Sequence, residues 1–176
     1  AWNADGSIAS EGFNSWASTY NQGTMLGAAT MLYKYTGEEQ YKQDADAVYH
    51  YTYNKLTNNK KIISVCQTIN GDLCGFKGIL MRYVRRYAED LDNPKALQWI
   101  AKNAWHAYQN RMMQGKRSVT WSAWLTKTAQ NLSRQENGET KNVSNDPVGQ
   151  ATAVSAAVNA HINGLYAKDA SQQIGV

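Results

Sequence analysis

Hydrophobic residues recur every three or four positions along most of the chain, a spacing that predicts helices, and we find no alternating strand pattern of useful length. The first segment, 21–35, is apolar or small nearly all the way round, as in a helix that is buried on most sides, and Gly37 is expected to end it. The next segment, 39–56, combines one apolar stripe with a charged face. It therefore predicts a helix that is half exposed.

The same pairing recurs along the chain. An apolar stripe runs through 76–91, and Asn93–Pro94 is a helix start whose stripe continues through Met112, with Gly115 as the expected stop. A last helix is expected over 149–168. Its predicted buried side consists of Val154, Ala157, Val158, His161, Ile162 and Leu165. Alternation of mostly apolar with amphipathic helices predicts stacked helix hairpins in which inner helices are buried and outer helices half exposed.

Three segments are less regular. A short helix is expected within 120–132, through the two tryptophans there, whereas 134–147 is polar and predicts a long surface loop. Residues 170–176 are expected to fray. The chain of 176 residues is thus predicted to be a single, all-α unit whose long loops, before the inner helices, form the functional face.

Amino-acid composition limits the classes of ligand that the chain is expected to bind. The chain has 6 Trp and 11 Tyr but only 2 Phe. Trp and Tyr join an apolar ring to a polar group, so most are expected to pack on helices while others suit a wet, sugar-binding cleft. The net charge of +4 is spread thinly, which argues against nucleic-acid binding. No transmembrane run, metal-ligand motif or cofactor motif is present in the sequence.

Cys66 and Cys74 are the only cysteines. They lie in a loop-like stretch, and we favour a local disulfide between them if the chain is secreted. Two thiols are the alternative.

Three signals carry candidate chemistry. In 11–23, polar and aromatic residues precede a buried helix, and the amides of Asn21 and Gln22 can donate to and accept from sugar hydroxyls or take part in helix capping. Lys77 falls in the first turn of an apolar helix, where the helix dipole disfavours a cation; a surface lysine is the alternative reading. Trp121 and Trp124 could line a cleft or simply pack.

These motifs also carry a family resemblance. The segment EGFNSWASTYNQGTMLGAATMLYKYTG, followed about 40 residues later by FKGILMRYVRRYA, resembles glycoside hydrolase family 76, the α-1,6-mannanases and their fungal cell-wall relatives, and within it a bacterial, Bacteroidetes-like branch. The resemblance implies an (α/α)6 toroid with an open cleft for linear α-1,6-mannan. It also implies retaining hydrolysis by two adjacent aspartates.

The chain departs from this family at the catalytic pair, because it contains no Asp-Asp sequence. Its adjacent acidic pairs, Glu38–Glu39 and Glu89–Asp90, are expected to be solvated charges at helix ends. In the family the aspartates precede the YNQG motif, so the chain resembles the C-terminal half of the enzyme and is expected to be inactive alone, with no catalytic residue of its own. The sugar-binding residues that the resemblance implies are Tyr20, Asn21, Gln22, Phe76, Lys77, Trp121 and Trp124.

Two alternatives stay open: a non-catalytic mannan-binding module, and a helical scaffold or interaction protein. The expected ligand is α-mannan or a mannooligosaccharide, and the expected location is secreted, periplasmic or at the outer cell surface. An open half-toroid would expose apolar faces on its first and last inner helices. We therefore expect either a missing N-terminal half or self-association through those helices.

Overall fold

The computed structural model describes residues 17–67, 71–128, 133–142 and 147–160, and these form five helices and two short β-hairpins. The helices are α1 (Thr19–Thr36), α2 (Glu39–Lys55), α3 (Leu73–Asp90), α4 (Pro94–Gln109) and α5 (Pro147–Asn159). The antiparallel hairpins are β1 (Met112–Gln114) with β2 (Arg117–Val119), and β3 (Ser133–Glu136) with β4 (Glu139–Asn142). The fold is all-α in class, as the sequence predicts.

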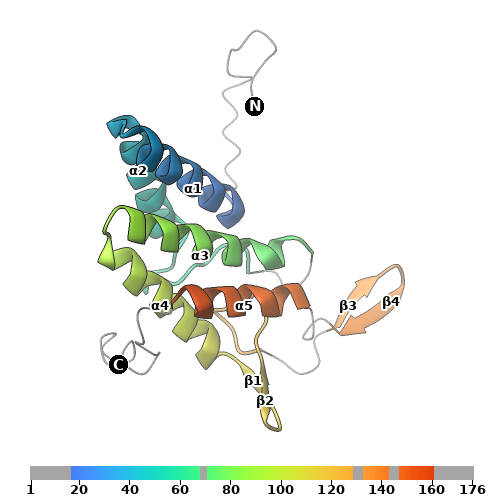
Figure 1. The fold of residues 1–176 in the computed structure, drawn as a ribbon. Coiled ribbons are helices and arrows are strands. Elements are labelled where there is room, and N and C mark those ends of the chain that lie inside the picture. Colours follow the sequence, from blue (N-terminus) through green and yellow to red (C-terminus); the bar gives the residue numbers. More distant parts are fainter. Residues whose placement is uncertain (1–16, 68–70, 129–132, 143–146, 161–176) are drawn as a thin grey trace.

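Helices α1, α3 and α5 lie side by side and run in the same direction, with their N-terminal ends toward the hairpins (Figure 1). Helix α2 packs on α1, and α4 packs on α3 and α5. The chain therefore forms helix hairpins with α1, α3 and α5 as the inner helices, which is the arrangement of part of an (α/α)6 toroid.

The helix ends follow from local chemistry. Ser18 begins α1 by accepting a hydrogen bond on its Oγ from the Asn21 N–H, and Gly37 ends it in the left-handed conformation with φ 73°. Asn93 caps α4 in the same way, and Pro94 occupies the first turn. The predicted boundaries of the first two helices and the start of α4 are thus confirmed to within two residues.

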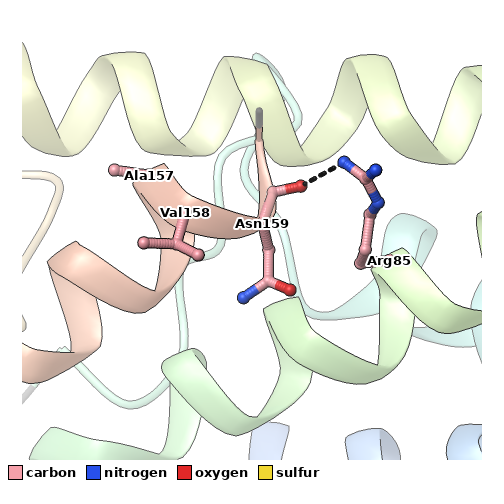
Figure 2. Close-up of a pocket in the computed structure, with 4 residues that line it drawn as sticks. All are labelled: Arg85, Ala157, Val158 and Asn159. Carbon is pink, nitrogen blue, oxygen red and sulfur yellow. Dashed lines mark hydrogen bonds between the residues drawn. The ribbon is translucent and has the colours of Figure 1, made fainter. Parts of the chain in front are cut away.

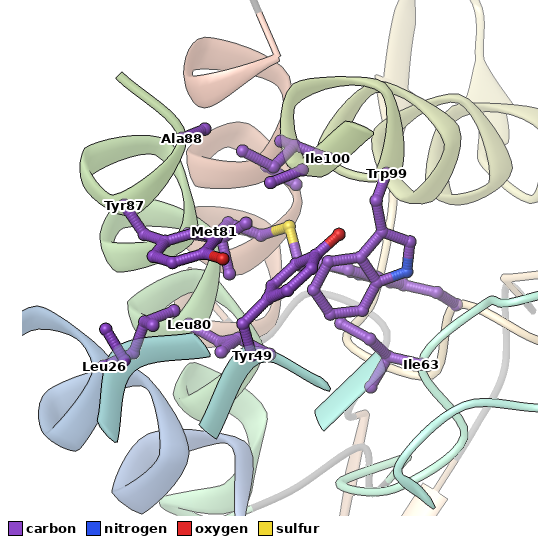
Figure 3. Close-up of a cluster of buried hydrophobic side chains, with 14 of the residues drawn as sticks. Leu26, Tyr49, Ile63, Leu80, Met81, Tyr87, Ala88, Trp99 and Ile100 are labelled. Atoms are coloured by element: carbon purple, nitrogen blue, oxygen red, sulfur yellow. The ribbon is translucent and has the colours of Figure 1, made fainter. Parts of the chain in front are cut away.

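The core joins all five helices through buried aliphatic and aromatic side chains (Figure 3). Tyr49 of α2 stacks on Tyr87 of α3 at 4.9 Å between ring centroids and meets Trp99 of α4 edge-on at 5.9 Å. Two of these rings also have hydrogen-bonded polar atoms, since the Tyr87 hydroxyl donates to Asp46 and the Trp99 indole donates to the Lys61 carbonyl. These aromatic residues are packing residues.

Glycines allow the inner helices to approach one another closely. A Cβ added at Gly23 of α1 would lie 2.8 Å from the Leu80 Cα of α3, and one at Gly78 would lie 3.1 Å from the Thr152 Cα of α5. The side chains of Thr152 and Ser155 donate to the carbonyls of Cys74 and Gly78. Helix α3 is therefore contacted closely on both flanks.

Four expectations about secondary structure were wrong. Residues 120–128 form turns rather than a helix, and helix α4 ends at Gln109, so Met112 belongs to β1. The stretch expected to be a surface loop contains the β3–β4 hairpin, which turns at Asn137–Gly138 with positive φ at both residues. Helix α5 begins at Pro147, and Val154, Ala157 and Val158 of its predicted buried side are exposed.

Some expectations fall outside the described residues. These are the positions 161–168 of the last helix, the tail 170–176 and the end of the predicted short helix at 129–132. Among the described helices, none is long and apolar enough to cross a membrane. The described residues also contain no group of three or more His, Cys, Asp or Glu side chains placed to hold a metal ion.

Candidate functional site

The N-terminal ends of α1 and α3 bring two aromatic side chains together. Tyr20 of α1 and Phe76 of α3 lie 5.2 Å apart between ring centroids, with 35° between their planes. Tyr20 is 41% exposed and Phe76 is partly buried. The pair thus forms a solvent-accessible aromatic surface at the end of the inner helices that faces the hairpins.

Asn21 and Gln22 follow Tyr20 in the first turn of α1, Asn21 exposed and Gln22 partly buried. Neither side chain caps the helix, because Ser18 performs that role. Both residues therefore lie in the same helical turn as Tyr20.

Lys77 lies beneath this end of the molecule and is completely buried. Its Nζ donates a hydrogen bond to the Ser122 carbonyl and lies 4.7 Å from the centroid of the Trp124 ring. Burial lowers the pKa of Lys77 to about 7, and the nearby thiols of Cys66 and Cys74 oppose that shift. The predicted role of Lys77 as a direct sugar contact is corrected, because no part of its side chain reaches the surface; nor is it the surface lysine of the alternative reading.

The two tryptophans belong to the turns between β2 and the second hairpin. Trp124 is completely buried and Trp121 is nearly so, with its indole N–H donating to the Thr126 carbonyl. In this structure Trp124 therefore supports the site from below and does not face a ligand. Its predicted role in lining the cleft is corrected accordingly.

Side chains that the sequence analysis did not single out hold this turn segment in place. The Trp124 carbonyl lies 2.9 Å from His106 Nδ1 and accepts a hydrogen bond from the Asn110 amide at 2.7 Å. The Gln67 side chain accepts from the Leu125 N–H. His106 and Asn110 are one helical turn apart on α4, and this spacing was the only signal in the sequence for their joint role.

The predicted disulfide is absent. Cys66 and Cys74 both keep their thiols and are buried, Cys66 in a loop and Cys74 in the first turn of α3. Both thiols act electrostatically on the Lys77 ammonium. The two cysteines therefore belong to the buried surroundings of Lys77 and do not form a covalent link with each other.

The adjacent acidic residues lie at the opposite end of the inner helices, as helix-end charges. Glu89 forms an ion pair with Arg85, and Asp90 forms ion pairs with Lys34 and Arg86. Burial alone would raise the pKa of Asp90, but its hydrogen bonds to Lys34 and Arg86 outweigh burial and hold that pKa below its usual value. Both carboxylates at this end are therefore paired with cations.

An open hollow of about 520 Å³ also lies away from the aromatic surface. Arg85, Ala157, Val158 and Asn159 line it, and the Arg85 guanidinium donates to the Asn159 carbonyl (Figure 2). It contains none of the predicted sugar-binding residues.

Few carboxylates lie at the N-terminal ends of the inner helices. The first turns of α1, α3 and α5 contain no acidic residue, and Asp72 precedes α3 as a single carboxylate. Glycoside hydrolysis by the two-carboxylate route needs a pair. The described first turns of these three helices therefore contain no such pair.

Comparison with known proteins agrees with this fold. Residues 3–168 match the model of Glycosyl hydrolase family 76. A comparison with curated proteins gives no match. The Lin0763 protein from Listeria innocua is similar with a TM-score of 0.64 and 24% identity, over 88% of this chain and 40% of that one.

Two further solved structures bear on the ligand. The GH76A α-1,6-mannanase from Salegentibacter sp. HEL1_6 has a TM-score of 0.62 and 24% identity, over 82% of this chain and 41% of that one. An inactive variant of that enzyme, with two consecutive aspartates replaced by alanine, was solved with α-1,6-mannotetrose and is 25% identical, with a TM-score of 0.61 over 82% of this chain and 40% of that one. The chain thus spans about two fifths of the length of these relatives.

Proposed function

Since the chain belongs to glycosyl hydrolase family 76, we propose that it supplies the sugar-binding surface of a module acting on α-1,6-linked mannan. The aromatic surface of Tyr20 and Phe76 carries the proposal, because the C–H face of a pyranose ring packs on such rings. The amides of Asn21 and Gln22 would hydrogen-bond the hydroxyl groups at the edge of the same ring. A surface of this kind belongs where mannan occurs, which is outside the cytoplasm.

In the same proposal, the catalytic carboxylates lie outside this chain, in the N-terminal half of the family fold. The Salegentibacter variant that lacks two consecutive aspartates is inactive, and this chain contains no Asp-Asp sequence. Of the two adjacent acidic pairs that the chain does contain, Glu38–Glu39 lies at the start of α2 and Glu89–Asp90 is held in ion pairs at the far end of α3. Hydrolysis would then need a segment that supplies the missing pair.

A mannan-binding module without catalysis is the second candidate. The same aromatic surface supports it, and it differs only in having no complementary catalytic segment. A purely structural role is the remaining alternative, and it predicts no sugar affinity at all.

Titration calorimetry with α-1,6-mannotetrose tests the binding surface. We expect Tyr20→Ala and Phe76→Ala each to weaken binding about tenfold, the factor that corresponds to about 1.4 kcal/mol. Tyr35→Ala is the matched control, because Tyr35 is 90% exposed at the opposite end of the same helix. No measurable binding by the unaltered chain, or an equal loss in the control, would contradict the proposal.

Incubation with linear α-1,6-mannohexaose separates binding from turnover. We expect the sugar to remain intact with this chain alone, since the described N-terminal ends carry no carboxylate pair. Release of shorter sugars would show that a catalytic pair lies within the chain and would refute that part of the proposal.

A further inference from the structure

The positive charge of the chain is concentrated in two stretches of sequence that hold no acidic residue. These stretches are 47–71 and 93–135, and together they contain ten of the 18 lysines and arginines. The rest of the chain holds the other eight and all 14 acidic residues. Adjacent basic pairs are rare in the sequence, so this division is visible only when the acidic residues are mapped as well.

In the fold, both stretches include the end of an outer helix that lies toward the hairpins. The first contains the C-terminal half of α2 and the loop after it, and the second contains α4, the β1–β2 hairpin and the turns that follow. The acidic residues of α2 lie in its first half, and Asp92 lies just before α4. The described acidic residues at the hairpin end belong to other elements, namely Asp72 before α3 and Glu136 and Glu139 of the second hairpin. The outer layer is thus positive at its hairpin end.

At the C-terminal end of α4, three side chains stack on the outer surface of the helix. Trp105 and Tyr108 lie 5.5 Å apart between ring centroids, with 26° between their planes, and the Arg111 Cζ lies 3.6 Å from the centroid of the Tyr108 ring. Tyr108 is 48% exposed, while Trp105 and Arg111 are partly buried. Arg111 also donates from Nη1 to the Tyr108 carbonyl at 2.8 Å. We refer to these three residues as the α4 stack, in which a ring and a carbonyl hold the guanidinium in place.

Two lysines flank the α4 stack. Lys102 precedes Trp105 by three positions, so the two are neighbours on the helix surface. The exposed Lys127 donates from Nζ to the Gln109 carbonyl at 3.1 Å. Among the described residues, neither lysine forms an ion pair, and Arg111 forms none either. The helix dipole favours cations beside the last carbonyls of a helix, which explains where two of these cations lie but gives none of them a carboxylate.

The α4 stack lies at the same end of the molecule as the aromatic surface of Tyr20 and Phe76. Asn110, at the end of α4, donates to the Trp124 carbonyl at 2.7 Å. The Trp124 ring lies 4.7 Å from the Nζ of Lys77, which follows Phe76 in α3. One turn segment therefore connects the two surfaces, and a polymer longer than the aromatic surface can reach both. The stack is on the face of α4 that is turned away from α3 and α5, and so lies apart from the two flanks of the inner layer.

We propose that the α4 stack and its flanking lysines bind an anionic group of an acidic glycan, so that mannan carrying phosphate, sulfate or carboxylate groups is held more tightly than neutral mannan. The inference rests on the proposed function, because it takes the ligand to be a glycan. A guanidinium presents two N–H groups in the geometry that an oxyanion accepts. Since Arg111 is already held against Tyr108, less conformational entropy is lost when the anion binds.

The geometry of the α4 stack favours an anionic sugar over a nucleic acid. Single-stranded nucleic acids bind largely by stacking their bases on aromatic rings. The Tyr108 ring already contacts Trp105 and Arg111, so a base would have to displace one of them. An anionic group adds to the guanidinium and ammonium N–H groups and displaces neither.

Titration calorimetry at low salt tests the charge of the ligand. The probes are linear α-1,6-mannohexaose and the same sugar after phosphorylation, sulfation or carboxymethylation. We expect at least one acidic form to bind about tenfold more tightly than the neutral sugar. The advantage should shrink as the salt concentration rises, because salt screens charges near the surface. The form that gains most identifies the anionic group that the site takes, and equal affinity for all four sugars would overturn the proposal.

Substitutions locate the site. Arg111→Gln and Lys127→Gln should each remove most of the advantage of the acidic sugar and leave the affinity for neutral mannotetrose unchanged. Arg111→Lys keeps the charge but loses the planar fork, and should retain only part of the advantage. Lys95→Gln is the matched control, because it makes the same change of charge at an exposed position at the other end of α4. An equal loss in that control would show that the ligand responds to net charge alone and would overturn the site. Thermal unfolding should show that every variant still folds.

The same titrations separate this inference from the proposed function. A chain that binds mannotetrose through Tyr20 but gains nothing from acidic groups would refute the inference and keep the proposed function. A chain that binds the acidic sugar through Arg111 but does not bind mannotetrose would refute the proposed aromatic surface and keep this site. An oligothymidylate with the same charge as the acidic sugar is the last probe. Tighter binding of that probe would assign the α4 stack to nucleic acid and would overturn the proposal.

Discussion

The two ends of helix α3 carry positive charge in opposite ways. Near its N-terminus, Lys77 is completely buried between a carbonyl and an indole ring. Near its C-terminus, Arg85 and Arg86 form ion pairs with acids one turn further along the same helix, close to solvent. Burying the Lys77 ammonium costs desolvation free energy, and its hydrogen bond fixes the turn segment that contains Ser122. The ion pairs of Arg85 and Arg86 lie near solvent, so forming them costs little desolvation free energy. The structural role of a charged residue thus depends on whether the fold buries it or leaves it near solvent.

The largest expected effect comes from removing the buried lysine. Lys77→Ala leaves a cavity beside Trp124 and releases the link between α3 and the Ser122 carbonyl, so we expect a loss of about 2 to 5 kcal/mol in the free energy of unfolding. Urea unfolding measures it. Lys77→Met, which keeps most of the volume, should lose much less. Lys95→Ala, at an exposed position on α4, is the control, and a Lys77→Ala variant as stable as that control would contradict the burial described above.

The pH dependence of stability should sharpen the contrast between the two ends. The pKa of Lys77 is about 7 in the folded chain and 10.5 in the unfolded chain, so between these values the unfolded chain binds one proton more. The titration of Lys77 therefore makes the free energy of unfolding rise as the pH increases from about 7 toward 10.5.

Urea unfolding across that range should show a steeper rise for the unaltered chain than for Lys77→Met. The difference between the two proteins removes the contribution of other groups. Parallel curves would show that Lys77 keeps its ordinary pKa.

The smallest effect is expected at the C-terminal end of α3. Asp90→Asn removes the ion pairs to Lys34 and Arg86. The two cations are exposed although the Asp90 side chain is only 9% exposed, so we expect a loss of about 1 kcal/mol at neutral pH. The pKa of Asp90 is lowered, so its contribution is present above the ordinary value of 3.8 and is lost as the pH falls below it. Thermal unfolding at pH 7 and in acid checks both statements. A loss as large as that of Lys77→Ala would remove the contrast between the two ends.

Much of the fold could be predicted from local sequence. Gly37 ends α1 because the left-handed conformation there suits glycine, and Asn93–Pro94 starts α4 because a capping amide precedes a residue with no N–H to satisfy. The stripe through Tyr83, Val84 and Tyr87 indicated the face of α3 that packs. These signals lie within one or two turns of the chain and need no knowledge of the tertiary contacts.

The candidate site was predicted only in part, since its buried half depends on distant segments. Tyr20 and Phe76, two of the residues predicted to bind sugar, do lie together at the N-terminal ends of α1 and α3. The burial of Lys77 depends on Ser122, 45 residues away, and no pattern within α3 reports it. The orientation of α5 was wrong because its small polar residues are bonded to carbonyls of α3, which outweighs the apolar stripe.

The close contact of α3 with helices on both flanks has a consequence for the order in which the molecule opens. Amide hydrogens exchange with solvent when their hydrogen bonds break, and segments with fewer neighbours open at lower free energy. The described part of α5 has one flank on α3 and one in water in a single chain, so its amides should exchange before those of α3. Hydrogen exchange followed over time should therefore show opening that begins at α5, and the amides of α3 should stay protected longest.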